Sequence, residues 1–364
     1  SFQAFAQEQF PGEEWAAARR RAGAYVEGFD AAEPERVSMQ WLRQTEEAAA
    51  SIEGDERQHR LLGGYDLLPL ALLNSLDPQR ARLVLNTTVH ELRWSRGHVE
   101  ASVGATAPGS TGANASLTAR AAIITLPLGV LAASLMPAAS AASAASAASA
   151  ASVPGELTGS VRFIPALPQK RAALARLAMG HACKVVLRFR ERFWDMPLMS
   201  PHGDLARLPL LTALKAPRLS FLFAADEALP TWWTHYPLLT PRLTAWAGGP
   251  RAERLASLTD AAIADRALDS LAHALGMARG SLDGLLDAWH IHNWSRDPFA
   301  RGAYSYVCVG GIDAPRLLGE PVEDTLFFGG EATNDAGHTG MVHGALATGK
   351  RAAQEVIAHL ASRQ

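Results

Sequence analysis

The residues best suited to chemistry lie near the end of the chain, where two glycines and a glutamate follow an apolar run. The run Leu326-Phe327-Phe328 leads into Gly329-Gly330-Glu331, and Gly340-Met341-Val342-His343-Gly344-Ala345 then opens a segment of small residues. This order predicts a buried strand, a tight glycine turn and a helix. Because a helix start presents unpaired N–H groups and a partial positive charge, it suits a phosphate or the electron-rich edge of a reduced cofactor ring. A glycine turn alone is a weak signal, since such turns are common in α/β proteins.

Lys184 is a second candidate, within the apolar segment 182–189. Two-residue alternation predicts a strand with Lys184 on the face opposite the core residues Cys183, Val185, Leu187 and Phe189. From the residues alone, a lysine that reaches water from a strand edge is the favoured interpretation. The alternative is a partly desolvated amine beside a cofactor, whose pKa would fall toward neutrality.

Residues 294–306 form the most distinctive segment, which contains Trp294, Tyr304 and Tyr306. The two tyrosines are two residues apart, so a strand would place them on one face, and Gly302 permits a bulky partner to approach closely. Tyrosine and tryptophan in strands are often ordinary core residues. We favour an aromatic wall here, because a flat cofactor or a substrate amine needs a rigid apolar surface with a polar edge.

Metal chemistry and two common catalytic motifs are not indicated. His290 and His292 could share a strand face, but no third ligand lies nearby in the sequence and a structural role is favoured. Neither a nucleophile-elbow G-x-S-x-G nor a P-loop occurs. We predict no metal site.

Length and composition are those of a globular enzyme of about two domains. The 364 residues are 48% hydrophobic and 19% charged, with a net charge of −2. No block of Lys and Arg suggests nucleic acid or an anionic membrane surface as a partner. The cysteines Cys183 and Cys308 are isolated, which favours a reducing compartment over a disulfide framework. No targeting segment is visible, and we expect a cytoplasmic protein.

The uncharged run 121–139 has the composition of a membrane span but not its continuity. Pro127, Gly129 and Pro137 interrupt it, and 121–126 is better explained as a buried strand that ends in a turn. We expect no membrane span.

The expected elements alternate between helices and strands. Residues 1–58 are expected to be helical, with Trp15, Ala18, Ala22, Val26 and Phe29 forming one apolar stripe that packs in the core. Thr259 and Gly276 are expected to begin and end a helix. Further helices are expected at 67–73 and from Pro168 to about Gly180, and strands at 82–86, 89–94, 99–103, 116–119, 121–126, 181–189, 289–294 and 302–309. The Ala-Ala-Ser repeat at 138–152 is expected to be a tolerated surface insertion, disordered or weakly helical.

Together these segments resemble the flavin-containing amine oxidase family, which comprises monoamine oxidases, polyamine oxidases and flavin-type histone lysine demethylases. The resemblance runs from about Gly63 to the end of the chain, with its motifs in the family's order. The matching segments are Gly63-Gly64-Tyr65, Asn86-Thr87-Thr88-Val89, Thr125-Leu126-Pro127-Leu128-Gly129-Val130-Leu131, Lys184 before Val185-Val186-Leu187, Phe193-Trp194, the block 294–306, and Gly330-Glu331.

The resemblance implies roles for individual residues. Val89 would contact the adenosine part of FAD, and Glu331 its ribityl and phosphate portion, within a cofactor-binding set of Val89, Pro127, Trp294, Gly330, Glu331, Met341 and Val342. Met341 and Val342 would face the pyrimidine edge of the flavin. The catalytic set would be Lys184, near a water at flavin N5, Tyr304, beside the substrate amine, and Trp294, behind that wall. Ala303 stands where covalently flavinylated members have a cysteine, so FAD should be noncovalent.

The departures from the family pattern matter as well. No G-x-G-x-x-G fingerprint occurs, so we expect a chain that lacks most of the dinucleotide-binding Rossmann segment. Met341 replaces the second aromatic residue of monoamine oxidases, which favours polyamine-type substrates.

The sequence thus predicts an α/β fold with mixed sheets and two domains. An incomplete FAD domain would comprise 59–167 and 289–364, and a substrate domain 1–58 and 168–288. The resemblance implies oxidation of a small-molecule amine by hydride transfer to flavin N5, imine hydrolysis and reduction of O2 to hydrogen peroxide, with no macromolecular partner. Two alternatives stay open, an amino-acid oxidase or desaturase of the same superfamily, and an inactive fragment or binding module.

Overall fold

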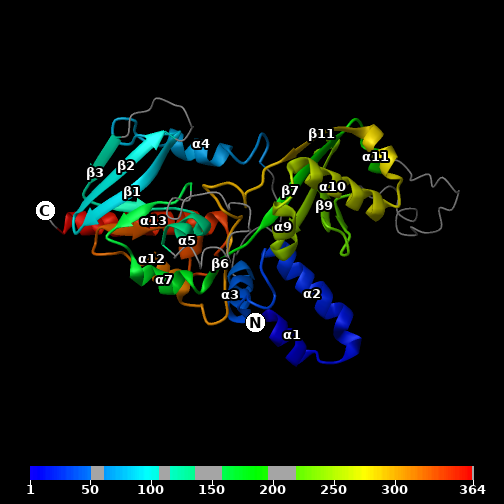
Figure 1. The fold of residues 1–364 in the computed structure, drawn as a ribbon, viewed down its shortest axis with the longest axis horizontal. Coiled ribbons are helices and arrows are strands. Elements are labelled where there is room, and N and C mark those ends of the chain that lie inside the picture. Colours follow the sequence, from blue (N-terminus) through cyan, green and yellow to red (C-terminus); the bar gives the residue numbers. More distant parts are fainter. Residues whose placement is uncertain (51–60, 106–114, 136–157, 196–218, 363–364) are drawn as a thin grey trace.

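The chain forms two lobes, each with its own hydrophobic core (Figure 1). The structure is a computed structural model, and it describes residues 1–50, 61–105, 115–135, 158–195 and 219–362. Among the described residues, the first core draws on 26–41, 92–99, 124–135, 161–178 and 306–332, and the second on 183–193 and 229–291. The Ala-Ala-Ser repeat lies outside the described residues.

The first lobe carries a four-stranded sheet in the order β3-β2-β1-β5. Its antiparallel part is the predicted meander, and β5 pairs with β1 in parallel. The strand expected at 82–86 is wrong, because these residues pair with none of the described strands, and Leu83 and Leu85 are exposed. The strands of this sheet are β1 (Thr87–Ser95), β2 (His98–Ala105), β3 (Ala115–Ala119) and β5 (Arg162–Ile164).

Two short strands at the centre of this lobe lead into the glycine turn. The strands β4 (Ala122–Ile124) and β13 (Leu326–Phe328) run parallel, and β13 is fully buried. A 3-10 turn, Glu331–Thr333, follows, and the long helix α13 (Val342–Ala361) comes next. The predicted strand, glycine turn and helix are therefore confirmed.

Three further helices surround these strands: α5 (Leu128–Leu135), α7 (Pro168–Leu174) and α12 (Ala314–Gly319). The expectation that the helix at Pro168 continues to Gly180 is wrong. It ends at Leu174, because Leu177–Met179 forms β6 and pairs with β12 (Ser305–Val307). Tertiary pairing here outweighs the local helix signal.

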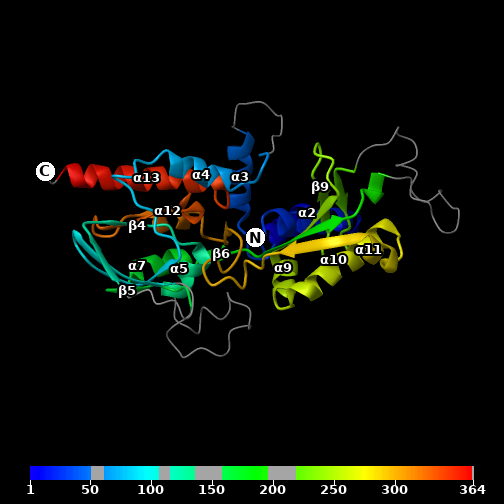
Figure 2. The same ribbon diagram turned by 90° about the horizontal axis from the view of Figure 1, so that it is seen from above.

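The second lobe is built on a five-stranded antiparallel sheet in the order β11-β7-β10-β9-β8. Figure 2 shows α10 against one face of this sheet and α2 toward the other. As expected, the Thr259 hydroxyl caps α10 and Gly276 ends it at φ +63°. The elements are β7 (Ala182–Phe189), β8 (Phe221–Phe223), β9 (Thr231–Thr234), β10 (Arg242–Gly248), β11 (Leu286–Ile291), the 3-10 turn Phe193–Asp195, α9 (Gly249–Ala256), α10 (Asp260–Leu275) and α11 (Arg279–Leu285).

The first 50 residues are helical, as predicted, but their apolar stripe is not core. Val26 is buried, whereas Trp15 and Phe29 are 45% and 58% exposed, and Ala18 and Ala22 are also exposed. The helical spacing is confirmed, but none of the described elements covers most of that face. The elements are α1 (Phe2–Gln9), the 3-10 turn Glu13–Trp15, α2 (Ala16–Phe29) and α3 (Met39–Ala50), and α4 (Leu67–Asn74) follows at the predicted place. Among the described residues, none of the helices is both long and apolar enough to cross a membrane.

Candidate active site

A cavity of about 210 Å³ lies where the N-terminal helices meet the glycine-rich end of the chain. Its walls come from the end of α2, the start and middle of α3, the residues that enter β12 and the turn before α13. The lining residues are Phe29, Asp30, Trp41, Thr45, Tyr304, Ser305, Thr339, Gly340 and Met341. The cavity thus combines aromatic walls, one carboxylate and a stretch of backbone at a helix start.

Tyr304 spans this cavity from the α13 side to the α2 side. A methyl group at Gly340, where φ is +81°, would lie 3.4 Å from Tyr304 Cδ2 and 3.9 Å from its Cβ. At the other end of the ring, the Tyr304 hydroxyl donates to the carbonyl oxygen of Phe29 over 2.6 Å. Burial, and then the charge of Asp30, raise the pKa of Tyr304 above its ordinary value, so the hydroxyl stays protonated.

Glu331 joins the start of β12, which directly follows Tyr304, to the turn that carries Met341. One carboxylate oxygen accepts from the Ser305 N–H (3.1 Å), and the other accepts from the Ser305 hydroxyl (2.6 Å) and the Gly340 N–H (2.7 Å). Burial raises the pKa of Glu331, while these three hydrogen bonds act in the opposite direction. The carboxylate therefore fixes both walls of the cavity, and one of its roughly four acceptor positions remains.

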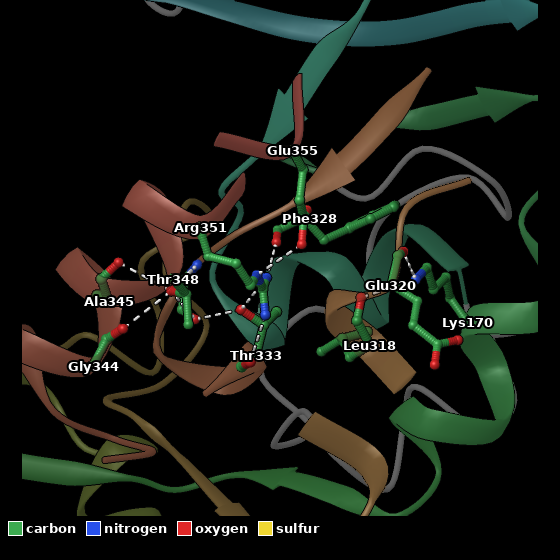
Figure 3. A network of polar contacts seen from close by, with 11 residues as sticks. Lys170, Leu318, Glu320, Phe328, Thr333, Gly344, Ala345, Thr348, Arg351 and Glu355 are labelled. Carbon is green, nitrogen blue, oxygen red and sulfur yellow. Dashed lines mark hydrogen bonds and ion pairs between the residues drawn. The ribbon is translucent and has the colours of Figure 1, made fainter. Parts of the chain in front are cut away.

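The glycine turn is held from α13 by side chains one turn apart (Figure 3). The Thr348 hydroxyl accepts from the Gly330 N–H (3.0 Å) and lies within hydrogen-bonding distance of the carbonyls of Gly330, Gly344 and Ala345. The Arg351 guanidinium donates to the carbonyls of Phe328 and Thr333. The turn before the cavity is thus fixed from behind, by the helix that follows it.

Lys170 fixes the neighbouring helix, α12, in the same region (Figure 3). Its ammonium donates to the carbonyls of Leu317, Leu318 and Glu320 and lies 4.3 Å from the centre of the Phe328 ring. Burial lowers the pKa of Lys170 to about 8. This lysine satisfies the C-terminal carbonyls of α12, so its role is structural.

The structure brings together only some of the residues that the sequence singled out. Tyr304 and Met341 line the cavity, Glu331 contacts two lining residues, Gly330 precedes it and Val342 begins α13. The other four predicted residues, Lys184, Trp294, Val89 and Pro127, are not among the lining residues. Their roles at a cofactor remain predictions.

The surroundings of these four residues are nevertheless clear. Lys184 is exposed and pairs across the sheet with Trp246, so the partly desolvated amine is not what the described residues form. Trp294 is 47% exposed and its ring packs on His292. Val89 lies next to a bulge in β1 and packs against the first core, and Pro127 is exposed and precedes α5.

His290 and His292, for which the sequence favoured a structural role over metal binding, have different surroundings. His292 pairs with Asp297 over 3.0 Å, and His290 is exposed at the end of β11. In the part of the chain that the structure describes, no group of three or more potential ligands could hold a metal ion.

Sequence reasoning missed the contribution of the N-terminal helices to the cavity. The cavity is lined by Phe29, Asp30, Trp41 and Thr45, so the expectation that Phe29 packs in the core is wrong. One signal in the sequence could have shown this. The apolar stripe ends at Phe29, directly before the carboxylate of Asp30, and a charge at the end of such a stripe often marks the edge of the core.

The cavity and the adjacent glycine turn fit a flavin. Gly330 has φ +125°, and a Cβ there would meet no atom of the described residues within 4 Å, so these residues leave open space beside the turn. In the part of the chain that the structure describes, no side chain caps the start of α13, which leaves backbone N–H donors for an electron-rich group. The buried indole N–H of Trp41 also has no acceptor among the described residues. This donor set suits a ring with carbonyl oxygens and negative charge.

The fold is shared with solved amine oxidases. Wild-type putrescine oxidase bound to putrescine aligns with a TM-score of 0.69 and 18% identity over 98% of this chain and 68% of that one. Cyclohexylamine oxidase from Brevibacterium oxydans aligns with a TM-score of 0.65 and 18% identity, over 99% and 68% of the two chains. The fold is that of the flavin-dependent amine oxidases, as the sequence predicted.

The sequence comparison gives the family itself. Residues 1–357 match the family described as flavin containing amine oxidoreductase, and the chain belongs to that family. A Drosophila melanogaster protein named possible lysine-specific histone demethylase 1 is 30% identical over 80% of this chain and 29% of its own length. Arabidopsis thaliana probable polyamine oxidase 4 is 30% identical over 68% and 40% of the two chains, and rice polyamine oxidase 3 is 28% identical over 85% and 53%. The chain therefore spans about half or less of the length of these relatives.

Proposed function

We propose that this protein oxidises a polyamine-type substrate, with noncovalently bound FAD as the electron acceptor and O2 as the final oxidant. The observation that carries the proposal is the charge of the cavity. Among the described residues that line it, the charged one is Asp30, whose side chain is a carboxylate. An anion between aromatic walls attracts a cationic amine. It repels the carboxylate of an amino acid, and no arginine is among the lining residues to counter that repulsion.

Each part of the site has a role in this reaction. Tyr304 and Trp41 confine the substrate chain between rigid apolar surfaces, and Glu331 keeps Tyr304 and Met341 in register through Ser305 and Gly340. The uncapped start of α13 would hold the electron-rich edge of the flavin. When bound, the flavin supplies the two-electron acceptor for the carbon–nitrogen oxidation.

Two further features support the finer parts of the proposal. Relatives of this chain are named polyamine oxidases, and a putrescine oxidase shares its fold. Ala303, before Tyr304, offers no thiol for a covalent bond to the flavin. Lys184 and Trp246 lie on the same face of the sheet, and the Trp246 indole N–H donates to the carbonyl oxygen of Gly28 at the end of α2. The proposal therefore keeps a role for Lys184 near the site.

The test is flavin retention followed by a peroxide assay. After incubation with FAD and desalting, the protein should keep the visible absorbance of flavin, and acid precipitation should release that flavin into the supernatant. Hydrogen peroxide should then form with spermidine or 1,4-diaminobutane and not with leucine. Loss of all flavin on desalting, or peroxide from leucine alone, would reject the proposal.

A further inference from the structure

The cavity has two chemically different ends, and the side chain of Tyr304 extends from one end to the other. The Cβ end of this tyrosine lies against Gly340, beside Met341 and the start of α13. The hydroxyl end lies on the carbonyl of Phe29, and Asp30 is the next residue along the chain. The two ends are therefore separated by the length of a tyrosine side chain.

The α2 end of the cavity is strongly electronegative. The Asp30 carboxylate makes no hydrogen bond or ion pair with the described residues, although Asp30 is mostly removed from water. Asp30 caps the C-terminus of the 14-residue helix α2, where the macrodipole is negative. Glu46 of α3 adds a second negative charge close enough to act on Asp30.

The end of α2 is also fixed in position. The carbonyl of Gly28 accepts from the Trp246 indole N–H over 2.7 Å, and that of Phe29 accepts from the Tyr304 hydroxyl. Two carbonyls that a helix end leaves unpaired are thus bonded to side chains from both lobes. Asp30 follows directly and lines the cavity, so its backbone is held at one end of the cavity.

We infer that Asp30 binds the second ammonium group of a diamine or polyamine substrate, while the amine to be oxidised lies at the α13 end. The inference rests on the proposed function and gives its site a substrate class. A largely buried carboxylate that pairs with none of the described residues destabilises the protein, and a bound cation would remove that cost. The Phe29, Trp41 and Tyr304 rings would add attraction to the same cation.

The separation of the two ends suits the chemistry. The amine that is oxidised must be neutral when it loses a hydride, because an ammonium nitrogen has no lone pair to stabilise the iminium product. A carboxylate in contact with that nitrogen would favour its protonated form. A carboxylate one tyrosine length away can bind the other nitrogen as an ammonium without holding the reacting one in the unreactive state.

The experiment compares a diamine with a monoamine of the same chain length, 1,4-diaminobutane and butylamine. For Asp30→Asn, we expect the ratio of kcat/KM for the diamine to kcat/KM for butylamine to fall about tenfold or more, mainly through KM. Glu46→Gln should lower the ratio less. Glu47→Gln, the next residue of α3, which pairs with Arg43 instead, should leave the ratio as it is. Equal losses for both amines, or no loss, would overturn the inference.

A second measurement does not depend on turnover. The rise in Tm caused by 1,4-diaminobutane should exceed that caused by butylamine in the wild-type protein, and the excess should vanish in Asp30→Asn. If butylamine is oxidised and the excess is absent in the wild type, the Asp30 site is wrong and the amine oxidase assignment stands. If the excess follows Asp30 but neither amine yields peroxide, the binding site is right and the proposed oxidation is wrong.

Discussion

Asp30 links the binding of a cation to the pH dependence of folding. Burial is the main cause that raises the pKa of Asp30 from 3.8 to about 7, and the negative charge of Glu46 adds to it. Between these values the folded protein holds a proton that the unfolded chain has lost, so stability falls as pH rises from about 4 to about 7. At pH 8 the charged Asp30 lowers the free energy of unfolding by its full amount. This amount is at most about 4 kcal/mol, since one pKa unit corresponds to about 1.4 kcal/mol.

Asp30→Asn should therefore be more stable than the wild type at pH 8, and this advantage should shrink at pH 5. Urea unfolding at the two pH values measures both free energies of unfolding, and the difference between the proteins isolates Asp30 from other titrating groups. An advantage of equal size at both pH values would show that the carboxylate is not the cause.

Single residues also show what the sequence could and could not reveal. Tyr304, Glu331 and Met341 belong to segments with recognisable local patterns, and the structure places them together or in contact. Asp30 and Trp41 line the same cavity but precede Tyr304 by more than 260 residues. Nothing in the sequence around them indicates that they lie beside Tyr304. Lys184 fits its predicted strand, but its exposure depends on what covers the sheet, which alternation does not specify.

The element that positions the site is α13, which reaches back to the glycine turn through Thr348. Thr348→Val keeps the volume of the side chain but leaves the Gly330 N–H without its partner. We expect a loss of about 1–3 kcal/mol in the free energy of unfolding, the cost of a buried donor that is left unpaired. Weaker flavin retention should accompany this loss, because Arg351, without Thr348, would then hold the turn that would adjoin the flavin.

Thr348→Ser is the matched control, since it retains the hydroxyl and removes only a methyl group. Urea unfolding and flavin absorbance after desalting should both stay closer to the wild-type values. Equal losses in the two variants would assign the effect to packing rather than to the hydrogen bond.

Element boundaries followed local signals only where tertiary pairing agreed with them. Thr259 and Gly276 define α10 from within the helix, so their prediction is confirmed. Residues 82–86 have the composition of a strand but pair with none of the described strands. Leu177–Met179 are expected to be helical but form a strand that pairs with β12. Whether a short apolar run becomes a strand depends on a distant neighbour, which local periodicity cannot supply.

At the scale of the whole molecule, the cavity depends on both lobes at once. Tyr304 leads into a strand of the first lobe, Trp246 belongs to the sheet of the second, and each donates a hydrogen bond to the last turn of α2. The two hydrogen bonds link α2 to side chains from both lobes, whose hydrophobic cores form two clusters. A change in the second lobe should therefore reach Asp30 through α2, with no contact to the substrate.

Trp246→Phe tests this coupling, because it keeps an aromatic ring in β10 and removes the N–H that bonds to Gly28. We expect KM for 1,4-diaminobutane to rise about threefold to tenfold, with a much smaller change in kcat, since the loss of one hydrogen bond costs about 0.5–1.5 kcal/mol. Trp289→Phe is the control, an exposed tryptophan of β11 in the same sheet, and should leave KM unchanged. Faster amide exchange in the last turn of α2 should accompany the rise in KM for Trp246→Phe alone. A rise in KM without faster exchange would mean that Trp246 acts on the substrate by another route, and the position of Asp30 would then not depend on the second lobe.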